Sequence, residues 1–483
     1  MIDTKYIREK ILDLAVRGKL VAQDPKDGDA RDLLEEIQKE KEELIKAKKI
    51  KKEKAIDFVE KSLIYEIPES WEWTKAKNIF YIRRGGSPRP IKKFLTTENG
   101  INWIKIGDVE DNDKYLTSAK EKIIESGIAK SRLINPGDLI LTNSMSYGRP
   151  YISKIKGCIH DGWLVLSPYL NSINKEYFYY LIKSPYMQKS FNLAAKGAVV
   201  KNLNIDKVKE IFLPLPPLFE QKRIVEKIEE AFALLDEIEE AQDQIRILGE
   251  QIKSKVLDMA VRGELVPQDP SDGNAKDLLR EIQAEKENLI KAKKIKKEKK
   301  VSEIKEEEIP FEIPDFWEWT RLSNILDIRD GTHDTPRYVE HGVPLVTSKN
   351  LIGNKLSFDN IKYISEYDAE IINERSKVDK FDILMAMIGS IGNATIVEDD
   401  YNIAIKNVAL FKTRGMGLYH KYLYYYLISQ EINMKETSSG GVQRFVSLKF
   451  LRNYSFPLPP LAEQKRIVEK IEEIFAAVDA MID

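Results

Sequence analysis

The 483-residue sequence contains one cysteine and no long apolar run. Because Cys158 stands alone, an intramolecular disulfide framework and a zinc site made of several cysteines are excluded, and we expect a reducing, cytoplasmic setting. No stretch approaches the roughly 18 apolar residues of a membrane-spanning helix. The charged start MIDTKYIREKILD lacks the apolar stretch of a signal peptide. A membrane-spanning or secreted protein is therefore not expected.

An excess of charge of either sign is also lacking. The 77 lysines and arginines are balanced by 78 aspartates and glutamates, so the formal net charge is -1. Such a chain has no uniformly basic coat, and any site for a polyanion must be local. Apolar residues make up 42% of the chain and charged residues 32%, which is typical of a folded protein with long solvated helices.

The sequence contains none of the motifs of a self-sufficient enzyme that we sought. It has no Walker loop, no dinucleotide-binding glycine fingerprint and no nucleophile elbow. The strings INPGD, LPPLF and LPPLA do not fit the Asn/Asp-Pro-Pro-Tyr/Phe motif of an adenine methyltransferase. The four histidines, His160, His333, His341 and His420, are too scattered to predict a metal site. Any reaction chemistry is therefore expected in a partner.

Three segments of the chain occur twice, the shortest being residues 66–74, EIPESWEWT, which recur as EIPDFWEWT at residues 312–320. Residues 10–54 and 255–299 are identical at 35 of 45 positions, and residues 214–232 and 457–475 are identical at 17 of 19. The protein is therefore an internal duplication. We call these repeated segments the frames.

The inserts between the frames, residues 75–210 and 321–455, scarcely resemble one another. Both contain short apolar runs broken by Gly, Pro and Asn, a pattern typical of strands and turns. Frames that stay nearly identical are expected to meet the same partner twice, whereas unlike inserts suit two different targets. Duplication followed by drift is the alternative explanation.

A long amphipathic helix is predicted after Pro217. Apolar side chains recur mostly in steps of three and four from Val225 to Met259. An unbroken helix ending near Arg262 would rise roughly 65 Å at about 1.5 Å per residue, enough to separate two heads. Gly249 permits a kink in this helix but does not require one.

The second copy of this helix is split between the two ends of the chain. Its first part precedes Asp483, and the remainder begins near Ile7. The repeat is therefore circular, and we expect both termini beside the central helix, antiparallel long helices in a coiled-coil stem, and a pseudo-twofold relation between the halves. The candidate stem and partner-contact residues are Ile228, Phe232, Leu235, Ile471 and Phe475.

Residues 33–54 and 278–299 are predicted to form a second helical element in each copy. Each ends in the basic string AKKIKKEK. A solvated helix face is one interpretation of this lysine run, and contact with DNA phosphates or with a protein partner are the others.

The two inserts differ in charge. Residues 62–212, the first head, contain 23 Lys plus Arg and 15 Asp plus Glu, a net of +8, whereas residues 309–455, the second head, contain 17 and 19, a net of -2. The first head is therefore expected to bind a polyanion. Its basic residues concentrate in glycine-broken loops, and the second head carries donors beside glycine in corresponding stretches.

Arg and Lys on such loops can reach phosphates or guanine edges, and Asn or Gln can pair with adenine; ordinary turns between strands are the alternative. The candidates for DNA binding are Arg83, Arg84, Arg89, Lys92, Lys93, Asn143, Tyr147, Arg149, Lys196, Lys201 and Asn202 in the first head, and Arg329, His333, Arg337, Lys349, Asn393, Gln443, Arg444 and Lys449 in the second.

The frame motifs strongly resemble the conserved regions of specificity subunits of type I restriction-modification systems. The strings LDLAVRGKLVAQDP, IKKEK before EIPESWEW, and PLPPLFEQKRIVEKI carry this resemblance, and near-copies of each occur in the second half. The likeness covers nearly the whole chain, although the inserts match only a loose head pattern such as NPGDLILT.

The resemblance implies a non-catalytic DNA reader of α+β class. Two small α/β target-recognition domains would each bind one half of a bipartite, asymmetric site in double-stranded DNA, and antiparallel coiled-coil helices would set the spacing between the halves. The family's conserved helices dock two methyltransferase subunits, and restriction and translocase subunits complete the assembly. S-adenosylmethionine, ATP and Mg are expected in those partners, with no cofactor in this chain.

We accordingly predict five segments and carry one alternative function. The segments are 1–61 (N-terminal conserved helical region), 62–212 (target-recognition domain 1), 213–308 (central conserved region with the long helix), 309–455 (target-recognition domain 2) and 456–483 (C-terminal conserved helix). The alternative is a coiled-coil assembly scaffold whose heads bind proteins. DNA affinity that falls steeply with salt would favour the DNA reader over the scaffold.

Overall fold

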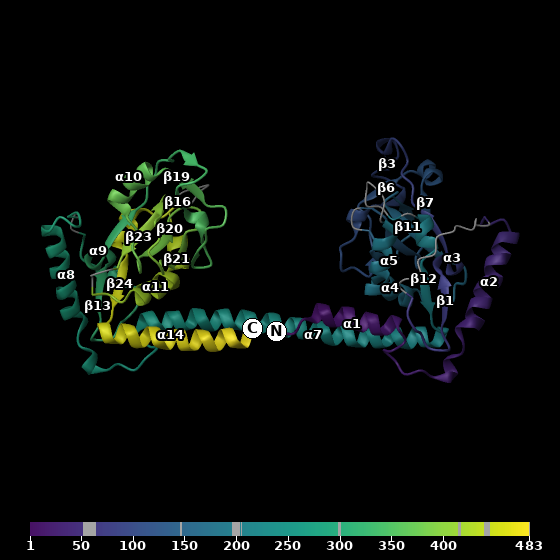
Figure 1. The fold of residues 1–483 in the computed structure, drawn as a ribbon, viewed down its shortest axis with the longest axis horizontal. Helices are drawn as coiled ribbons and strands as arrows, with labels where there is room; N and C mark the ends of the chain where they lie inside the picture. The colour runs from purple at the N-terminus through teal and green to yellow at the C-terminus, as the bar shows by residue number, and fades with distance from the viewer. Residues whose placement is uncertain are drawn as a thin grey trace. The chain divides into compact units, whose positions relative to one another are not determined.

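The computed structural model describes residues 1–51, 64–144, 147–195, 203, 205–297, 301–413, 417–438 and 445–482. The chain divides into two compact units, residues 1–241 and 242–483. Each unit combines a β-rich head with helices from the frames (Figure 1).

Unit 1 begins with two helices, continues through the first head and ends within a long helix. Its elements are α1 (Thr4–Val16), α2 (Ala30–Lys46), β1 (Glu72–Lys75), α3 (Ala76–Ile79), β2 (Phe80–Arg84), β3 (Leu95–Thr96), β4 (Ile101–Ile104), β5 (Tyr115–Leu116), β6 (Glu121–Ile123), β7 (Arg132–Ile134), β8 (Leu139–Thr142), β9 (Pro150–Ser153), β10 (Gly157–Ile159), β11 (Trp163–Pro168), α4 (Lys175–Lys183), α5 (Pro185–Ala195), α6 (Ile205–Lys209), β12 (Phe212–Leu215) and the first part of α7 (Leu218–Arg262).

Head 1, the part of unit 1 from β1 to β12, contains two five-stranded sheets of order β2-β11-β8-β9-β5 and β3-β6-β4-β10-β7. Pairing is antiparallel except between β4 and β10 and between β5 and β9. Side chains alternate between the two faces of a strand. Ile140 of β8 therefore packs toward the second sheet, whereas its neighbours Leu139 and Leu141 pack with Phe178 of α4. The first sheet thus lies between the second sheet and the helices.

Unit 2 repeats this plan. Its elements after α7 are α8 (Ala275–Lys291), β13 (Glu318–Arg321), α9 (Leu322–Ile325), β14 (Asp327–Asp330), β15 (Tyr338–Val339), β16 (Val343–Val346), β17 (Leu351–Ile352), β18 (Lys355–Leu356), β19 (Lys362–Ile364), α10 (Glu366–Ser376), β20 (Ile383–Ala386), β21 (Gly392–Ile396), β22 (Ala404–Ile405), β23 (Val408–Lys412), α11 (His420–Ser429), α12 (Glu431–Glu436), α13 (Leu448–Asn453), β24 (Ser455–Leu458) and α14 (Leu461–Ile482).

Head 2, from β13 to β24, has the same topology as head 1 although the two inserts are unlike in sequence. Its sheets have the orders β14-β23-β20-β21 and β15-β19-β16-β22, which match β2-β11-β8-β9 and β3-β6-β4-β10 strand for strand. The parallel pair β16-β22 takes the place of β4-β10. The expected α+β fold with an internal duplication is confirmed.

The long helix predicted from Pro217 to about Arg262 is confirmed as α7, a single helix of 45 residues. In unit 1, α1 runs antiparallel along its first part, where Arg8 pairs with Asp236 at 2.6 Å and covers the ring of Phe232. In unit 2, α14 runs antiparallel along the rest, and Lys253 pairs with Asp479 at 2.6 Å.

Gly249 does not interrupt α7. A Cβ atom at this position would lie 2.6 Å from Cδ1 of Ile482, so the glycine gives α14 room to approach closely. The stem candidates pack at these helix contacts: Ile228, Leu235 and Ile471 are buried, and Phe232 and Phe475 are partly buried.

The second helical elements are shorter than the sequence predicts. The segments 33–54 and 278–299 were expected to be helical, but α2 ends at Lys46 and α8 at Lys291. The positive φ of 57° at Lys48 ends the first helix, and the N–H of Lys49 turns back to the carbonyl of Leu44. This is a C-terminal helix cap, so residues 47–51 follow the helix and do not continue its face. Residues 52–54 and 298–299 of the predicted elements lie outside the described residues.

A buried carboxylate joins the frame to the head in unit 1. Glu220, in the first turn of α7, accepts a hydrogen bond from the indole N–H of Trp71 at 2.7 Å and another from the amide of Gln23 at 2.5 Å. Its side chain is almost fully buried. One side chain therefore holds the long helix, the segment after α1 and the start of the head together.

The same contact recurs in unit 2. Glu463, in the first turn of α14, accepts from Trp317 at 2.8 Å and from Gln268 at 2.6 Å. The next residues, Gln221 and Gln464, are also buried, and each bonds the backbone of its head and of the proline segment before its helix. The repeated Glu-Gln pair of the frames is therefore a structural joint.

Removal of one of these carboxylates is expected to destabilise the chain. Glu220→Ala leaves the buried indole N–H of Trp71 without its acceptor, which costs about 1–3 kcal/mol in the free energy of unfolding, measured by urea denaturation. Glu226→Ala, at an exposed position of the same helix, is the control and should change this free energy by less than about 0.5 kcal/mol. Equal effects of the two substitutions would contradict the role of the joint.

The joint also predicts a pH dependence. Burial raises the pKa of Glu220 and Glu463 above the ordinary value of 4.5, although their hydrogen bonds oppose this. A carboxyl with a raised folded-state pKa contributes stability that is complete below the unfolded-state pKa and is lost as the pH rises through the folded-state pKa. Wild-type stability relative to the Glu220→Gln/Glu463→Gln variant should therefore fall as the pH rises from 4.5 in a urea-denaturation series. A difference in the free energy of unfolding that does not change with pH would contradict this prediction.

Candidate nucleic-acid interface

The loop that follows the first long strand of head 1 holds most of the exposed basic candidates. Arg89 has 83% of its side chain exposed, and Lys92 and Lys93 are exposed as well. The loop is fixed by Ser87, whose hydroxyl donates to a carboxylate oxygen of Asp161 at 2.8 Å. These cations therefore stand in solvent on a loop with a defined attachment.

Two arginines of β2 have different surroundings. Arg83 is half-buried, donates to the hydroxyl of Ser167 at 3.1 Å and covers Tyr81. Burial and the nearby charge of Arg132 lower its pKa. Arg84 is exposed and donates to the backbone carbonyl of Asp161 at 2.9 Å. Of the two, Arg84 is better placed to meet a ligand.

The second candidate loop of head 1 is tied to the protein itself. Asn143 is 1% exposed, so its amide does not face solvent, and its backbone bonds Gly162 and Leu203. Tyr147 donates its hydroxyl proton to the side-chain oxygen of Asn192 at 2.8 Å, and Arg149 pairs with Asp111. Asn143 is therefore a structural residue in this conformation, while Tyr147 and Arg149 remain partly exposed.

Five of the candidates cannot be placed. Lys196, Lys201, Asn202, Gln443 and Arg444 lie outside the described residues.

In head 2 the equivalent first loop is held by a histidine. The ring nitrogens of His333 lie 2.9 Å from the amide oxygen of Asn407 and 3.0 Å from a carboxylate oxygen of Asp330. Arg375, which the sequence patterns did not single out, pairs with the same Asp330. Arg329 bonds Asp327 at 2.6 Å. These partners give a local reason for the low net charge of this face.

The remaining described candidates of head 2 lie in four separate segments: the loop before β15, the turn after β16, β21 and α13. Arg337, Lys349 and Lys449 are exposed, and no ion pair to them occurs in the described ranges. Asn393 has a φ of 49°, and its backbone N–H donates to Glu431 at 3.2 Å. Asn393 therefore supports the backbone of a turn.

Several basic residues near the loops were missed. Lys105 and Arg132 lie at strand ends of head 1, and Lys406 follows β22 in head 2, where it bonds Thr335. None lies in a glycine-broken stretch, so no local signal singles them out. Only the pairing of the strands brings them beside the loops.

A second charged cluster joins head 1 to α7. Lys114 lies 2.5 Å from Glu229 and 3.4 Å from Glu176, and its ammonium group lies over the ring of Tyr180. Burial lowers the pKa of Lys114, but these partners outweigh burial and raise it. Tyr115 completes the cluster by donating to Glu176.

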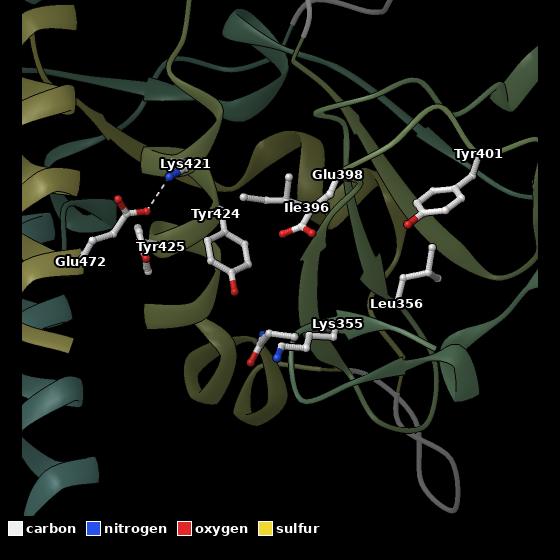
Figure 2. Close-up of a pocket in the computed structure, with 10 residues that line it drawn as sticks. Lys355, Leu356, Ile396, Glu398, Tyr401, Lys421, Tyr424, Tyr425 and Glu472 are labelled. Atoms are coloured by element: carbon white, nitrogen blue, oxygen red, sulfur yellow. Dashed lines mark hydrogen bonds and ion pairs between the residues drawn. The ribbon is translucent and has the colours of Figure 1, made fainter. Parts of the chain in front are cut away.

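Unit 2 has a pocket of about 480 Å³ at the equivalent place (Figure 2). On its helix side, Lys421 pairs with Glu472 at 2.6 Å. Lys421 of α11 occupies the position of Glu176 in α4, and Glu472 of α14 that of Glu229 in α7. Lys355 lines the other side of the pocket. It lies beside β21, just as Lys114 lies beside β9 in head 1. Unlike Lys114, it makes no ion pair within the part of the chain described. The head-to-stem contacts are therefore built differently in the two units.

The described residues contain no group of three or more His, Cys, Asp or Glu side chains arranged to hold a metal ion. Among them, no helix is both long enough and apolar enough to cross a membrane.

Residues 68–247 and 314–481 match the family model of the type I restriction modification DNA specificity domain. The chain belongs to this family. Each match takes in one head together with a stem helix, the first part of α7 or α14. The duplication read from the frames is therefore a duplication of this specificity domain.

Curated relatives and solved structures agree with the family. The chain is 29% identical to the type I restriction enzyme EcoAI specificity subunit of Escherichia coli, over 97% of this chain and 88% of the relative, and 27% identical to the EcoEI specificity subunit of the same organism, over 99% and 90%. Such subunits are non-catalytic components, so the predicted type I specificity subunit is confirmed.

Two solved chains share the fold. One is the HsdS subunit from Thermoanaerobacter tengcongensis, with a TM-score of 0.52, 19% identity, and coverage of 86% of this chain and 92% of that chain. The other comes from a study of complex assembly and conformational transition of the type I R-M system, with a TM-score of 0.55, 19% identity, and coverage of 86% and 93%.

Because the head-to-stem contacts differ between the two units, replacing the equivalent lysine by methionine should change the free energy of unfolding by different amounts. Lys114→Met removes the cation shared by Glu176 and Glu229 and should lower the free energy of unfolding by about 1.5–3 kcal/mol, the usual range for hydrogen bonds to charged groups. Lys355→Met is the matched control and should change it by less than about 0.5 kcal/mol. Urea denaturation checks both, and a Lys355 effect as large as that of Lys114 would refute the assignment.

Proposed function

We propose that this chain reads a bipartite, asymmetric site in double-stranded DNA, with one half-site for each head, and brings methyltransferase and restriction subunits to that site. The observation that carries the proposal is the shared topology of two heads whose exposed loops differ in charge and shape. One fold used twice with different surfaces is what two unlike half-sites require.

The repeated frames support two copies of one partner. The joint residues and the helices around them recur almost unchanged, so a subunit that docks on one frame finds the same surface on the other. We assign this repeated surface to two methyltransferase subunits.

The chemistry of such an assembly belongs to its other subunits. S-adenosylmethionine would serve the methyltransferase subunits, and ATP and Mg the restriction and translocase subunits, with no cofactor required in this chain. We place the complex in the cytoplasm, where its DNA substrate lies. The five segments 1–61, 62–212, 213–308, 309–455 and 456–483 stay the proposed functional divisions, with each head as one target-recognition domain.

The basic first head and the nearly neutral second head suggest unequal shares of the binding energy. Each phosphate neutralised by Lys or Arg adds to the salt dependence of DNA affinity. Head 1, with its exposed Arg89, Lys92 and Lys93, would supply most of this dependence. Head 2 would rely more on base contacts and on phosphate contacts from the partner subunits.

The first experiment is modified-base sequencing of DNA from cells that contain the chain with its methyltransferase subunit, compared with cells that contain the methyltransferase subunit alone. We expect a bipartite methyladenine motif that depends on the chain. If an active methyltransferase gives no such motif and the complex shows no salt-sensitive DNA binding, the chain is an assembly scaffold whose heads bind proteins.

The exchange of one head tests the two-reader organisation. Replacement of residues 62–212 by the first head of another specificity subunit should change one half of the methylated motif and leave the other half intact, because each head folds around its own sheets. The same replacement of residues 309–455 should change only the other half. A motif that survives either exchange unaltered would contradict the model.

A further inference from the structure

Head 1 contains a pocket of about 830 Å³ beside its exposed loop, a size within the roughly 300–1,000 Å³ of ligand-binding clefts. It is formed where the loop after β2 faces the second sheet. Its lining includes Arg89, Lys92, Trp103, Lys105, Glu121 and His160. Three of these are exposed or half-exposed cations and one is a carboxylate, while Leu95, 37% exposed, also lines the pocket and supplies apolar surface.

The pocket is held in shape by internal hydrogen bonds. His160 accepts a hydrogen bond at Nδ1 from the N–H of Gly162 at 3.0 Å, and its Nε2 lies 2.9 Å from Asp161. Its ring packs edge-on against Trp103. Asp161 also accepts the hydroxyl of Ser87. Both nitrogens of His160 are therefore occupied, and this residue positions the wall of the pocket.

Arg89 does not hold the pocket in shape. Its guanidinium group lies 3.8 Å from Asp161, and 83% of the side chain is exposed. Lys92 is also exposed, and no ion pair to it is found within the described ranges. The donors of these two side chains are therefore available to a ligand at the mouth of the pocket.

The strand registers give the counterpart of each sheet position in head 2. Two buried sheet positions keep their character, since Ile123 and Ile159 of head 1 correspond to Ile364 and Ile405. The positions that line the pocket do not. The pairs are Trp103 with Leu345, Glu121 with Lys362, Lys105 with Thr347, and His160 with Lys406.

The loop itself also differs in length. Gly85 donates its backbone N–H to Trp163 of β11, and Gly331 donates to Val408 of β23, which matches β11 in head 2. The two glycines therefore occupy equivalent positions. From Gly85 to Leu95 of β3 is ten residues, whereas from Gly331 to Tyr338 of β15 is seven. Head 2 therefore lacks three residues of the segment that covers the pocket in head 1. The lining and the covering segment of this pocket therefore differ between the two heads.

The composition of the pocket suits a base edge better than a phosphate. A phosphate clamp needs donors and is repelled by a carboxylate, yet Glu121 stands in the lining, 2.7 Å from Lys105. A base pair offers acceptors, donors and an apolar surface together, and Arg donating two bonds to guanine is the commonest specific contact. We propose that this pocket reads one base pair of the half-site of head 1, with Arg89 donating to a guanine edge. This inference rests on the proposed function.

The test compares Arg89→Lys and Arg89→Ala with the wild type, each as the full chain in complex with its methyltransferase subunit. Lys keeps the charge but loses the planar fork that makes two parallel bonds. Lys122→Ala is the matched control, because Lys122 is an exposed cation of β6 beside Glu121 that does not line the pocket. Duplexes carrying the wild-type methylated motif, and duplexes with single base-pair changes in it, are the probes. Affinity is measured at several salt concentrations.

Both Arg89 variants should lose discrimination at one guanine-containing position of one half-site, on the order of 10- to 100-fold, and should methylate a motif relaxed at that position. The other half-site and the Lys122→Ala complex should be unchanged. If Arg89→Ala weakens all duplexes equally and Arg89→Lys behaves as wild type, Arg89 contacts phosphate and the inference is wrong. Unchanged discrimination in both variants also overturns it. A wild-type complex without any sequence preference would instead overturn the proposed function.

Discussion

The buried carboxylates Glu220 and Glu463 are the contacts on which the rest of the structure depends. Each accepts hydrogen bonds from a head tryptophan and from a glutamine of the frame. A buried carboxylate is tolerated only when its oxygens find partners, so its position fixes the segments that supply those partners. The start of each head, the proline segment and the stem helix are therefore assembled as one piece. The exposed loops of each head are therefore positioned relative to this joint.

Much of the fold could be predicted from the sequence because its signals are local or repeated. The apolar period from Val225 to Met259 identified α7, and the duplicated frames predicted two equivalent halves. The lysine run after Lys46 was read as helix because its composition suits one, but the cap at Lys48 depends on backbone geometry that composition does not reveal. The common topology of the heads was also hidden, since strands need only alternating apolar residues and many sequences supply them.

The candidate interface could be predicted by region but not residue by residue. Glycine-broken basic loops located Arg89 and His333, whose surroundings are indeed exposed loops. The same pattern included Asn143, which is buried, because a loop sequence does not say which side chain faces inward. Lys105 and His160 were not singled out for DNA contact, since they come from strand ends far apart in sequence. Register between strands, which long-range pairing decides, brings them together.

The glycine that follows the first strand of each head has an evolutionary consequence. A Cβ at Gly85 or Gly331 would collide with the carbonyl oxygen of His160 or Ile405, so only glycine lets the backbone pass there. Beyond Gly85, Ile91 and Phe94 pack against the core of head 1, whereas Arg89, Lys92 and Lys93 are exposed. Most substitutions at such exposed positions leave the protein above its stability threshold. On the proposal that this loop reads a base pair, new sequence preferences would arise, or be engineered, by diversifying these exposed positions while the remainder of the gene stays fixed.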